Sequence, residues 1–175
     1  MTDGFSNIDC TITITDKKTK TAVVLTSDIS DFKEDSVQRK VEMKEIMGGM
    51  ILPRIHNPSQ KKITFNYISV DNSWEKYLGH DPDAGTIDKM DFDFYWGDID
   101  SNLYRIELKF SDGTNTLYKV YYDAIGLDIG TNIQDEILSG TISFIIPLKN
   151  ISGYTTYAVF TDATKLATYD TSMGY

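Results

Sequence analysis

Acidic side chains gather in the segment 80–91, HDPDAGTIDKMD, at a spacing close to that of a calcium loop. Loops of the EF-hand type place acids at positions 1, 3, 5 and 12 and glycine at position 6. With Gly85 at position 6, Asp81 and Asp83 fall at positions 2 and 4, and Asp91 falls at position 12. Two of the three acids therefore have the wrong parity, and we interpret the segment as a solvated acidic loop.

Residues for acid–base or nucleophilic catalysis do not form a recognisable set. The chain has two histidines and one cysteine, and His56 lies in a segment rich in glycine and proline. No glycine-rich phosphate loop and no nucleophile elbow is present. We expect a protein that is not an enzyme and that has no cofactor or metal. A pair of acids acting as in a glycosidase stays open, because the sequence does not give their separation.

Length and composition indicate one globular domain, residues 1–175. The hydrophobic fraction is 41%, which is enough for a core without metal or disulfides. The start of the chain lacks the pattern of a signal peptide, and no apolar run is long enough for a bilayer. We expect synthesis in the cytoplasm and no membrane anchor. A net charge of -9 disfavours tight binding to DNA.

Charge is unevenly distributed along the chain. Residues 81–100 contain seven Asp and one Lys, whereas residues 33–62 contain seven Lys or Arg and four acids. The two segments could pair within one molecule, or the basic segment of one copy could dock on the acidic segment of the next. The charged residues expected at such an interface are Lys40, Lys44, Lys61, Lys62, Asp81, Asp83 and Asp88.

Alternation with period two dominates the sequence and predicts β-strands. Segment 8–15 places Ile8, Cys10, Ile12 and Ile14 on one face, and 21–27 reads as its hairpin partner. Further strands are expected at 90–96, 103–110, 117–129 and 140–148. A change of parity after Ala124 predicts a bulge or bend. Short turns favour antiparallel pairing, so the predicted fold is mainly β, an antiparallel β-sandwich or barrel.

Two segments complete this expectation. Residues 71–79, DNSWEKYLG, predict one short α-helix, because apolar residues recur at helical spacing and glycine follows. Residues 28–36 are polar and read as a connection. The last segment, 151–175, is rich in Thr and Tyr and is either a final strand or an extension onto a neighbour.

Residues 37–68 predict a long two-stranded arm. Strand 37–47 is expected to pair with 61–70, and the segment between them, with two Gly and two Pro, is expected to form an irregular apolar tip. An apolar tip on a two-stranded arm needs a partner to cover it. The alternative is an arm folded onto its own core, and the physical arguments favour the two arrangements equally. The expected interface residues at the tip are Met47, Gly48, Gly49, Met50, Ile51, Leu52 and Arg54.

The order of these elements resembles the tail tube proteins of bacteriophages and of phage-like contractile injection machines. The resemblance covers about residues 5–150 and is carried by VQRKVEMKEIMGGMILP, ITFNYISVDNSWEKYLG and LSGTISFIIPL. It implies homo-hexameric rings that stack into a tube, with the arm touching an adjacent subunit and DNA passing through the lumen. It also implies sheath, baseplate and terminator proteins as partners, and a place in the tail of the virion after assembly in the host cytoplasm.

An acidic lumen agrees with that expectation, because like charge repels phosphate over a Debye length of ~8 Å and lets DNA slide. Two rivals stay open. One is another ring of a tail or baseplate, such as a terminator or hub. The other is a monomeric β-sandwich that binds a ligand through surface aromatic residues, of which tyrosine alone contributes 11.

Overall fold

The computed structural model resolves the alternating segments into strands. It describes residues 9–18, 20, 22–25, 29–37, 39–68, 103–134 and 137–175. The expected helix at 71–79, the expected strand at 90–96 and the acidic loop at 80–91 lie outside these residues.

The N-terminal hairpin forms as the alternation predicts. Strand β1 (Asp9–Asp16) pairs antiparallel with β2 (Ala22–Leu25) on one side and with β7 (Leu103–Ser111) on the other. Ile12 and Ile14 are buried on its inner face, whereas Cys10, at the start of the strand, is exposed. Cys10 was expected to face the core with Ile12 and Ile14 because it shares their parity. It is exposed instead, because the strand begins at the edge of the packed region.

The main sheet has eight strands, all paired antiparallel, and folds as a sandwich. Its order is β2-β1-β7-β8-β9-β6-β3, and β10 also pairs with β8. The remaining strands of this sheet are β3 (Ile29–Glu34), β6 (Gln60–Ile68), β8 (Thr116–Gln134), β9 (Ile137–Pro147) and β10 (Tyr157–Phe160). The predicted sandwich is confirmed. In the described residues the edge strands β2 and β3 do not pair, so the sheet does not close into a barrel.

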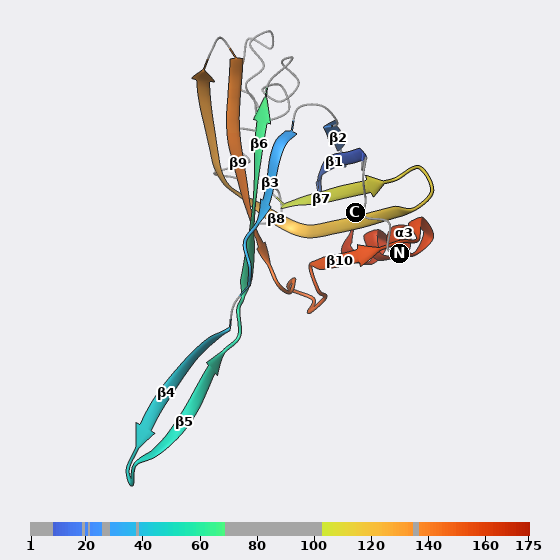
Figure 1. Ribbon diagram of the computed structural model, residues 1–175. Helices are drawn as coiled ribbons and strands as arrows, with labels where there is room; N and C mark the ends of the chain where they lie inside the picture. Colours follow the sequence, from blue (N-terminus) through green and yellow to red (C-terminus); the bar gives the residue numbers. More distant parts are fainter. Residues whose placement is uncertain are drawn as a thin grey trace, which may run out of the picture.

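The long strand β8 links the two halves of the sandwich and bends between them (Figure 1). Its first part pairs with β7 and its second part with β9, and the pairing register shifts once in each part. The shifts lie beside Ala124 and at Gly126, where a change of parity predicts a bulge. A bulge strengthens local twist, which here turns β8 from one half into the other.

Two apolar clusters hold the structure together. The larger lies between the halves of the sandwich and takes side chains from β1, β6, β7, β8 and β9, among them Phe65, Tyr121 and Phe144. The smaller contains Val120 and Tyr122, which face the opposite side of β8, with Leu166 and Met173. Both faces of β8 are thus covered in this region.

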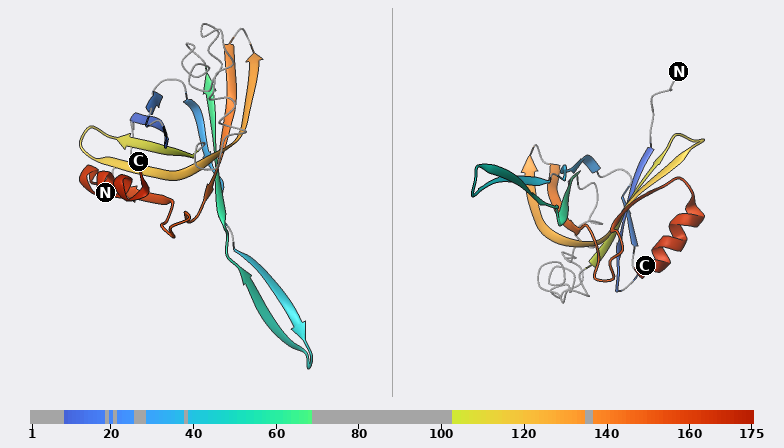
Figure 2. Two further views of the ribbon diagram at one scale, coloured as in Figure 1. Left: turned by 180° about the vertical axis from the view of Figure 1, so that it is seen from behind. Right: turned by 90° about the horizontal axis from the view of Figure 1, so that it is seen from below.

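The C-terminal segment forms β10 and the helix α3 (Ala163–Met173), which lies beside the sheet (Figure 2). Leu166 and Met173 of the helix pack over Val120 and Tyr122. The Asp162 carboxylate caps the helix by accepting hydrogen bonds from the N–H groups of Thr164 and Lys165, at 2.7 and 3.3 Å. Gly174 ends it in the left-handed conformation, at φ 81°. Of the two readings of 151–175, a final strand is confirmed and a helix follows it. In the described part of the chain, no helix has the length and apolar character for crossing a bilayer.

The arm differs from the prediction in its pairing. Strand β4 (Lys40–Ile46) pairs with β5 (Met50–His56) and forms a separate two-stranded sheet. The segment expected to be an irregular tip is therefore mostly a regular strand. Strand β6 pairs instead with β9 and with β3, the segment expected to be a connection. Gly48 and Gly49 confine the reversal to a tight turn, and Pro53 lies on a strand with one open edge, where proline is tolerated.

Candidate assembly surface

The hairpin β4–β5 projects away from the sandwich (Figures 1 and 2). Directly paired residues of an antiparallel hairpin lie on the same face. One face therefore carries Val41 opposite Ile55 and Met43 opposite Pro53, and nearer the turn it carries Ile51 opposite Glu45. The five apolar residues of this face, Val41, Met43, Ile51, Pro53 and Ile55, are called the apolar face of the arm.

The opposite face of the arm is divided. Near the base, Lys40 lies opposite His56 and Glu42 opposite Arg54, so this part is charged. Near the turn, Ile46 lies opposite Met50. The end of the hairpin thus carries apolar side chains on both faces, with Lys44 on one face and Glu45 on the other beside them, whereas its base is apolar on one face.

These apolar side chains are open to solvent in the single chain. Of the thirteen exposed large hydrophobic residues in the described part, eight lie on the arm, and Met47 in the turn is 97% exposed. Scattered apolar side chains are normal on a protein surface, but a contiguous patch marks an interaction site. Among the residues that the structure describes, the arm is therefore the strongest candidate for a contact surface.

The turn adopts a backbone conformation that favours glycine. Gly48 and Gly49 have φ of 93° and 75°, and the N–H of Gly49 donates to the carbonyl of Ile46 at 3.1 Å. No atom lies within 4 Å of the position where a Cβ would stand at either glycine. Glycine is used here for its positive φ and not for lack of space.

All seven residues expected at the arm tip lie on the hairpin or its turn. Six are in or beside the apolar end, whereas Arg54 lies on the charged face near the base. The prediction omitted Val41, Met43, Pro53 and Ile55, which share the apolar face with Ile51. Val41 and Met43 alternate with charged residues in 40–44, and pairing that segment with 50–56 as a strand would have placed Pro53 and Ile55 on the same face.

The charged residues expected at an interface separate into four groups. The Lys40 Nζ lies 2.7 Å from the Glu42 Oε1 on the same strand. Lys61 forms an ion pair with Glu34 and is largely buried, so in this structure it belongs to the interior of the chain. Lys44 and Lys62 are exposed. Asp81, Asp83 and Asp88 lie outside the described residues, and docking between arm and acidic loop stays a prediction.

A charged cluster ties the base of the arm to the sandwich. Glu34, at the end of β3, accepts hydrogen bonds from Lys61 on β6 and from Lys119 and Tyr121 on β8. Burial by itself raises the pKa of Glu34, but these three donors outweigh it and lower the pKa to about 2. Lys61 and Lys119 also lie over the ring of Tyr157. This cluster joins both halves of the sandwich where the arm leaves it.

A second charged cluster fixes α3 to the sheet. Arg105 is buried, and its Nε and Nη2 donate to the Asp170 carboxylate at 2.7 and 2.9 Å. Glu107 accepts from the same guanidinium, and the Tyr122 hydroxyl donates to Asp170 at 2.7 Å. Burial and then the hydrogen bond to Asp170 raise the pKa of Tyr122. Sequence analysis did not find this cluster, because Arg105 alternates outward on its strand as a solvated residue would.

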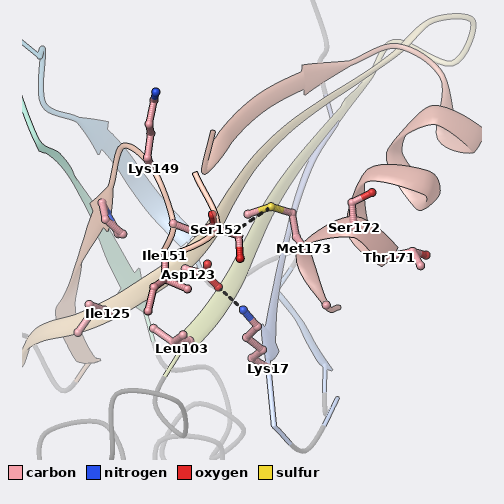
Figure 3. Close-up of a pocket in the computed structure, with 13 residues that line it drawn as sticks. Lys17, Leu103, Asp123, Ile125, Lys149, Ile151, Ser152, Thr171, Ser172 and Met173 are labelled. Carbon is pink, nitrogen blue, oxygen red and sulfur yellow. Dashed lines mark hydrogen bonds and ion pairs between the residues drawn. The ribbon is translucent and has the colours of Figure 1, made fainter. Parts of the chain in front are cut away.

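A hollow of about 530 Å³ lies between α3, the bend of β8 and the excursion 148–156 that links β9 to β10 (Figure 3). Leu103, Ile125 and Met173 contribute apolar surface to it. On one side of the hollow the Lys17 ammonium donates to Asp123 at 2.7 Å, and Asp123 also accepts from the Tyr175 hydroxyl at 3.1 Å. These charges neutralise each other, which leaves a mainly apolar depression with a polar rim.

The described residues contain no group of three or more His, Cys, Asp or Glu side chains that could hold a metal ion. His56 lies on the charged face of the arm, 3.4 Å from Glu42.

Comparison with solved structures places this architecture among parts of contractile injection systems. A chain of the PVC extracellular contractile injection system, in its extended sheath-tube complex, aligns with a TM-score of 0.56 at 8% identity, over 93% of this chain and 95% of that one. A chain of the anti-feeding prophage cap, which terminates the tube, aligns at 0.54 and 9% identity, over 93% and 94%. A chain of the anti-feeding prophage baseplate, solved with sixfold symmetry, aligns at 0.52 and 6% identity, over 91% and 97%.

By sequence, no protein family and no curated protein matches the chain. The likeness is therefore one of fold. It extends over nearly the whole length of both chains, and the fold expected from the resemblance to tail tube proteins is shown.

Proposed function

We propose that the chain is a structural subunit of the tube of a phage tail or of a phage-like contractile injection machine. Copies form hexameric rings, and the rings stack through the arm into a hollow tube. The observation that carries the proposal is the apolar face of the β4–β5 hairpin, which extends into solvent from a fold shared with injection-machine components. Covering that face with a second copy removes the apolar surface from water.

The proposal also says what passes through the tube and which proteins bind to it. The net charge of -9 suits a bore through which DNA passes without being bound. Sheath, baseplate and terminator proteins are the expected partners, the tail of a virion is the expected location, and assembly takes place in the host cytoplasm. The chain has no catalytic role in this scheme.

A terminal ring is the second candidate, because a chain of a tube-terminating cap aligns almost as well as a chain of a sheath-tube complex. The two functions differ in what the purified protein does at high concentration. A tube subunit polymerises into filaments of many rings, whereas a terminal ring stops at one layer. Negative-stain electron microscopy of concentrated protein distinguishes them, and a monomer under all conditions contradicts both.

The role of the arm is tested by Met50→Asp together with Ile51→Asp. Both residues are exposed, at 63% and 64%, so the variant is expected to fold as a monomer and to fail to assemble. The matched control is Ala167→Asp with Thr168→Asp, which adds the same charge to exposed positions of α3. Loss of the fold in the arm variant would show that the arm packs on its own chain.

A further inference from the structure

Besides the arm, the excursion 148–156, which is the loop between β9 and β10, also carries exposed apolar side chains. Ile151 is as exposed as in an unfolded chain, at 106%, and Tyr154 is 49% exposed. The excursion nevertheless has a defined shape. Asn150 receives the N–H of Tyr154 on its side chain at 2.8 Å, and Lys149 and Thr155 form an isolated β-bridge. The backbone on both sides of Ile151 is therefore held by hydrogen bonds, and its apolar side chain lies in water at the rim of the hollow beside α3.

A contact in which two different patches of one chain meet generates rings or filaments, and it requires two patches that complement each other. The described part of the chain shows such a pair. One is the convex end of the arm, with Met47, Met50 and Ile46. The other is the concave hollow beside α3, lined by Ile151 and Met173.

The hollow has room for apolar side chains, and the tip carries side chains of a suitable character. A hollow of about 530 Å³ is within the range of ~300–1,000 Å³ found for sites that enclose a ligand. Methionine is unbranched and flexible, so it fills irregular apolar sites well. The tip presents Met47 at a turn of two glycines, which lets a narrow end enter the hollow.

Charge at the edges of the two patches is also complementary. Glu45 lies on β4 two residues before Met47, and Lys149 lies at the rim of the hollow. Neither has an ion pair with any residue that the structure describes. An entering arm would bring a free carboxylate to a free ammonium, which sets the register of docking more than it adds affinity.

We infer that the hollow between α3 and the excursion 148–156 is the receptor for the arm tip of a second copy of this chain. This inference rests on the proposed function and adds to it the surface that the arm meets. The arm points away from its own sandwich, so the tip reaches the hollow of another molecule and not its own (Figure 1).

Disulfide trapping between two single-cysteine chains tests the contact directly. In a Cys10→Ser background, a tagged chain with Met47→Cys is mixed with an untagged chain with Ile151→Cys, under conditions where the wild-type chain assembles. Both sites are fully exposed in the single chain, so neither change is expected to disturb the fold. A disulfide requires Cα atoms within about 7 Å, which makes the trap specific. The control partner carries Val24→Cys, an exposed apolar site on β2.

The mixed Met47→Cys and Ile151→Cys dimer is expected to form at least tenfold faster than the control. Charge reversal gives an independent measurement. Glu45→Lys and Lys149→Glu should each raise the critical concentration for assembly, by about fivefold for the loss of one exposed ion pair. The double reversal should restore it.

Assembly with no trapped dimer above control and no effect of the reversals would overturn the receptor assignment and leave the proposed function standing. Failure of the wild-type chain to assemble at all would overturn both. A trapped dimer that forms while the double reversal gives no rescue would contradict the ionic part, Glu45 with Lys149.

Discussion

The hydroxyl of Tyr121 donates a hydrogen bond of 2.6 Å to the carboxylate of Glu34. Tyr121 is fully buried in the core of the sandwich, and Glu34 ends the strand from which the arm continues. The contact therefore connects the centre of the fold to the base of its most exposed element. With Lys61 and Lys119 on the same carboxylate, the arm leaves the body from a fixed point.

The first prediction concerns Glu34→Gln, which removes the charge but keeps the size. Two lysines would lose their counter-ion in a largely buried place, and we expect the free energy of unfolding at pH 7 to fall by about 2 kcal/mol. Chemical denaturation measures this. Glu45→Gln is the matched control, because it makes the same change on an exposed residue of the arm, and it should have almost no effect.

The same variant predicts how stability depends on pH. The pKa of Glu34 is lowered in the folded chain to about 2 from 4.5, so its contribution is complete above about pH 4.5 and is lost as the pH falls toward 2. The difference in unfolding free energy between wild type and Glu34→Gln should therefore shrink over that range. A difference that stays constant from pH 7 to pH 3 would contradict the assignment.

The second prediction concerns the attachment of α3. Asp170→Asn leaves the buried Arg105 without the partner that it contacts through two nitrogens, which should destabilise the chain by about 2–3 kcal/mol. Hydrogen exchange should show faster exchange in α3. Asp162→Asn is the control on the same helix, because asparagine caps a helix about as well as aspartate. Equal effects of the two substitutions would argue against the Arg105 cluster.

The third prediction concerns the turn of the arm. Gly49→Ala should disfavour the turn by about 1 kcal/mol, because an L-residue is strained at a φ of 75° although space for the methyl group is free. The hairpin amides should exchange faster, while the unfolding of the sandwich is unchanged. Gly130→Ala is the control, since that glycine has no positive φ and also has no atom within 4 Å of a new Cβ. If both variants leave the arm amides unaffected, the strain argument fails.

The fourth prediction concerns DNA. Binding to DNA gains free energy from counter-ions that cationic side chains displace, and a chain with a net charge of -9 has few to offer. We expect no retardation of duplex DNA by the assembled protein at physiological salt in a gel-shift assay. Retention that weakens steeply with salt would show a basic channel and would contradict the acidic lumen.

Local patterns predicted much of the sandwich because burial on one face of a strand leaves a period of two in the sequence. Ile106 and Leu108 on β7, and Ile142, Phe144 and Ile146 on β9, face the core as their spacing indicates. The parity change in β8 also marked its bulges, because an extra residue in one strand exchanges the two faces.

Strand pairing was harder to predict, because alternation states which face is apolar but not which strand lies alongside. The polar segment 29–34 and the proline-containing segment 50–56 both form strands, and each is held by a partner that its own composition does not reveal. The helix α3 escaped prediction for a related reason. Its residues are mostly Thr, Ala and Tyr, and it is stabilised by packing over Val120 and Tyr122 more than by its own propensity.

The sequence by itself determined that this is an antiparallel β protein with an apolar, glycine-containing tip, because period and composition are local properties. Only the tertiary structure decided that β4 pairs with β5, that the apolar face of the arm is left uncovered and that a hollow forms beside α3. The β4–β5 pairing is local, but the proline and the unbroken apolar run in 50–56 hide it from a reading of alternation. The hollow depends on contacts between residues far apart in the chain, and such contacts leave no period in the sequence.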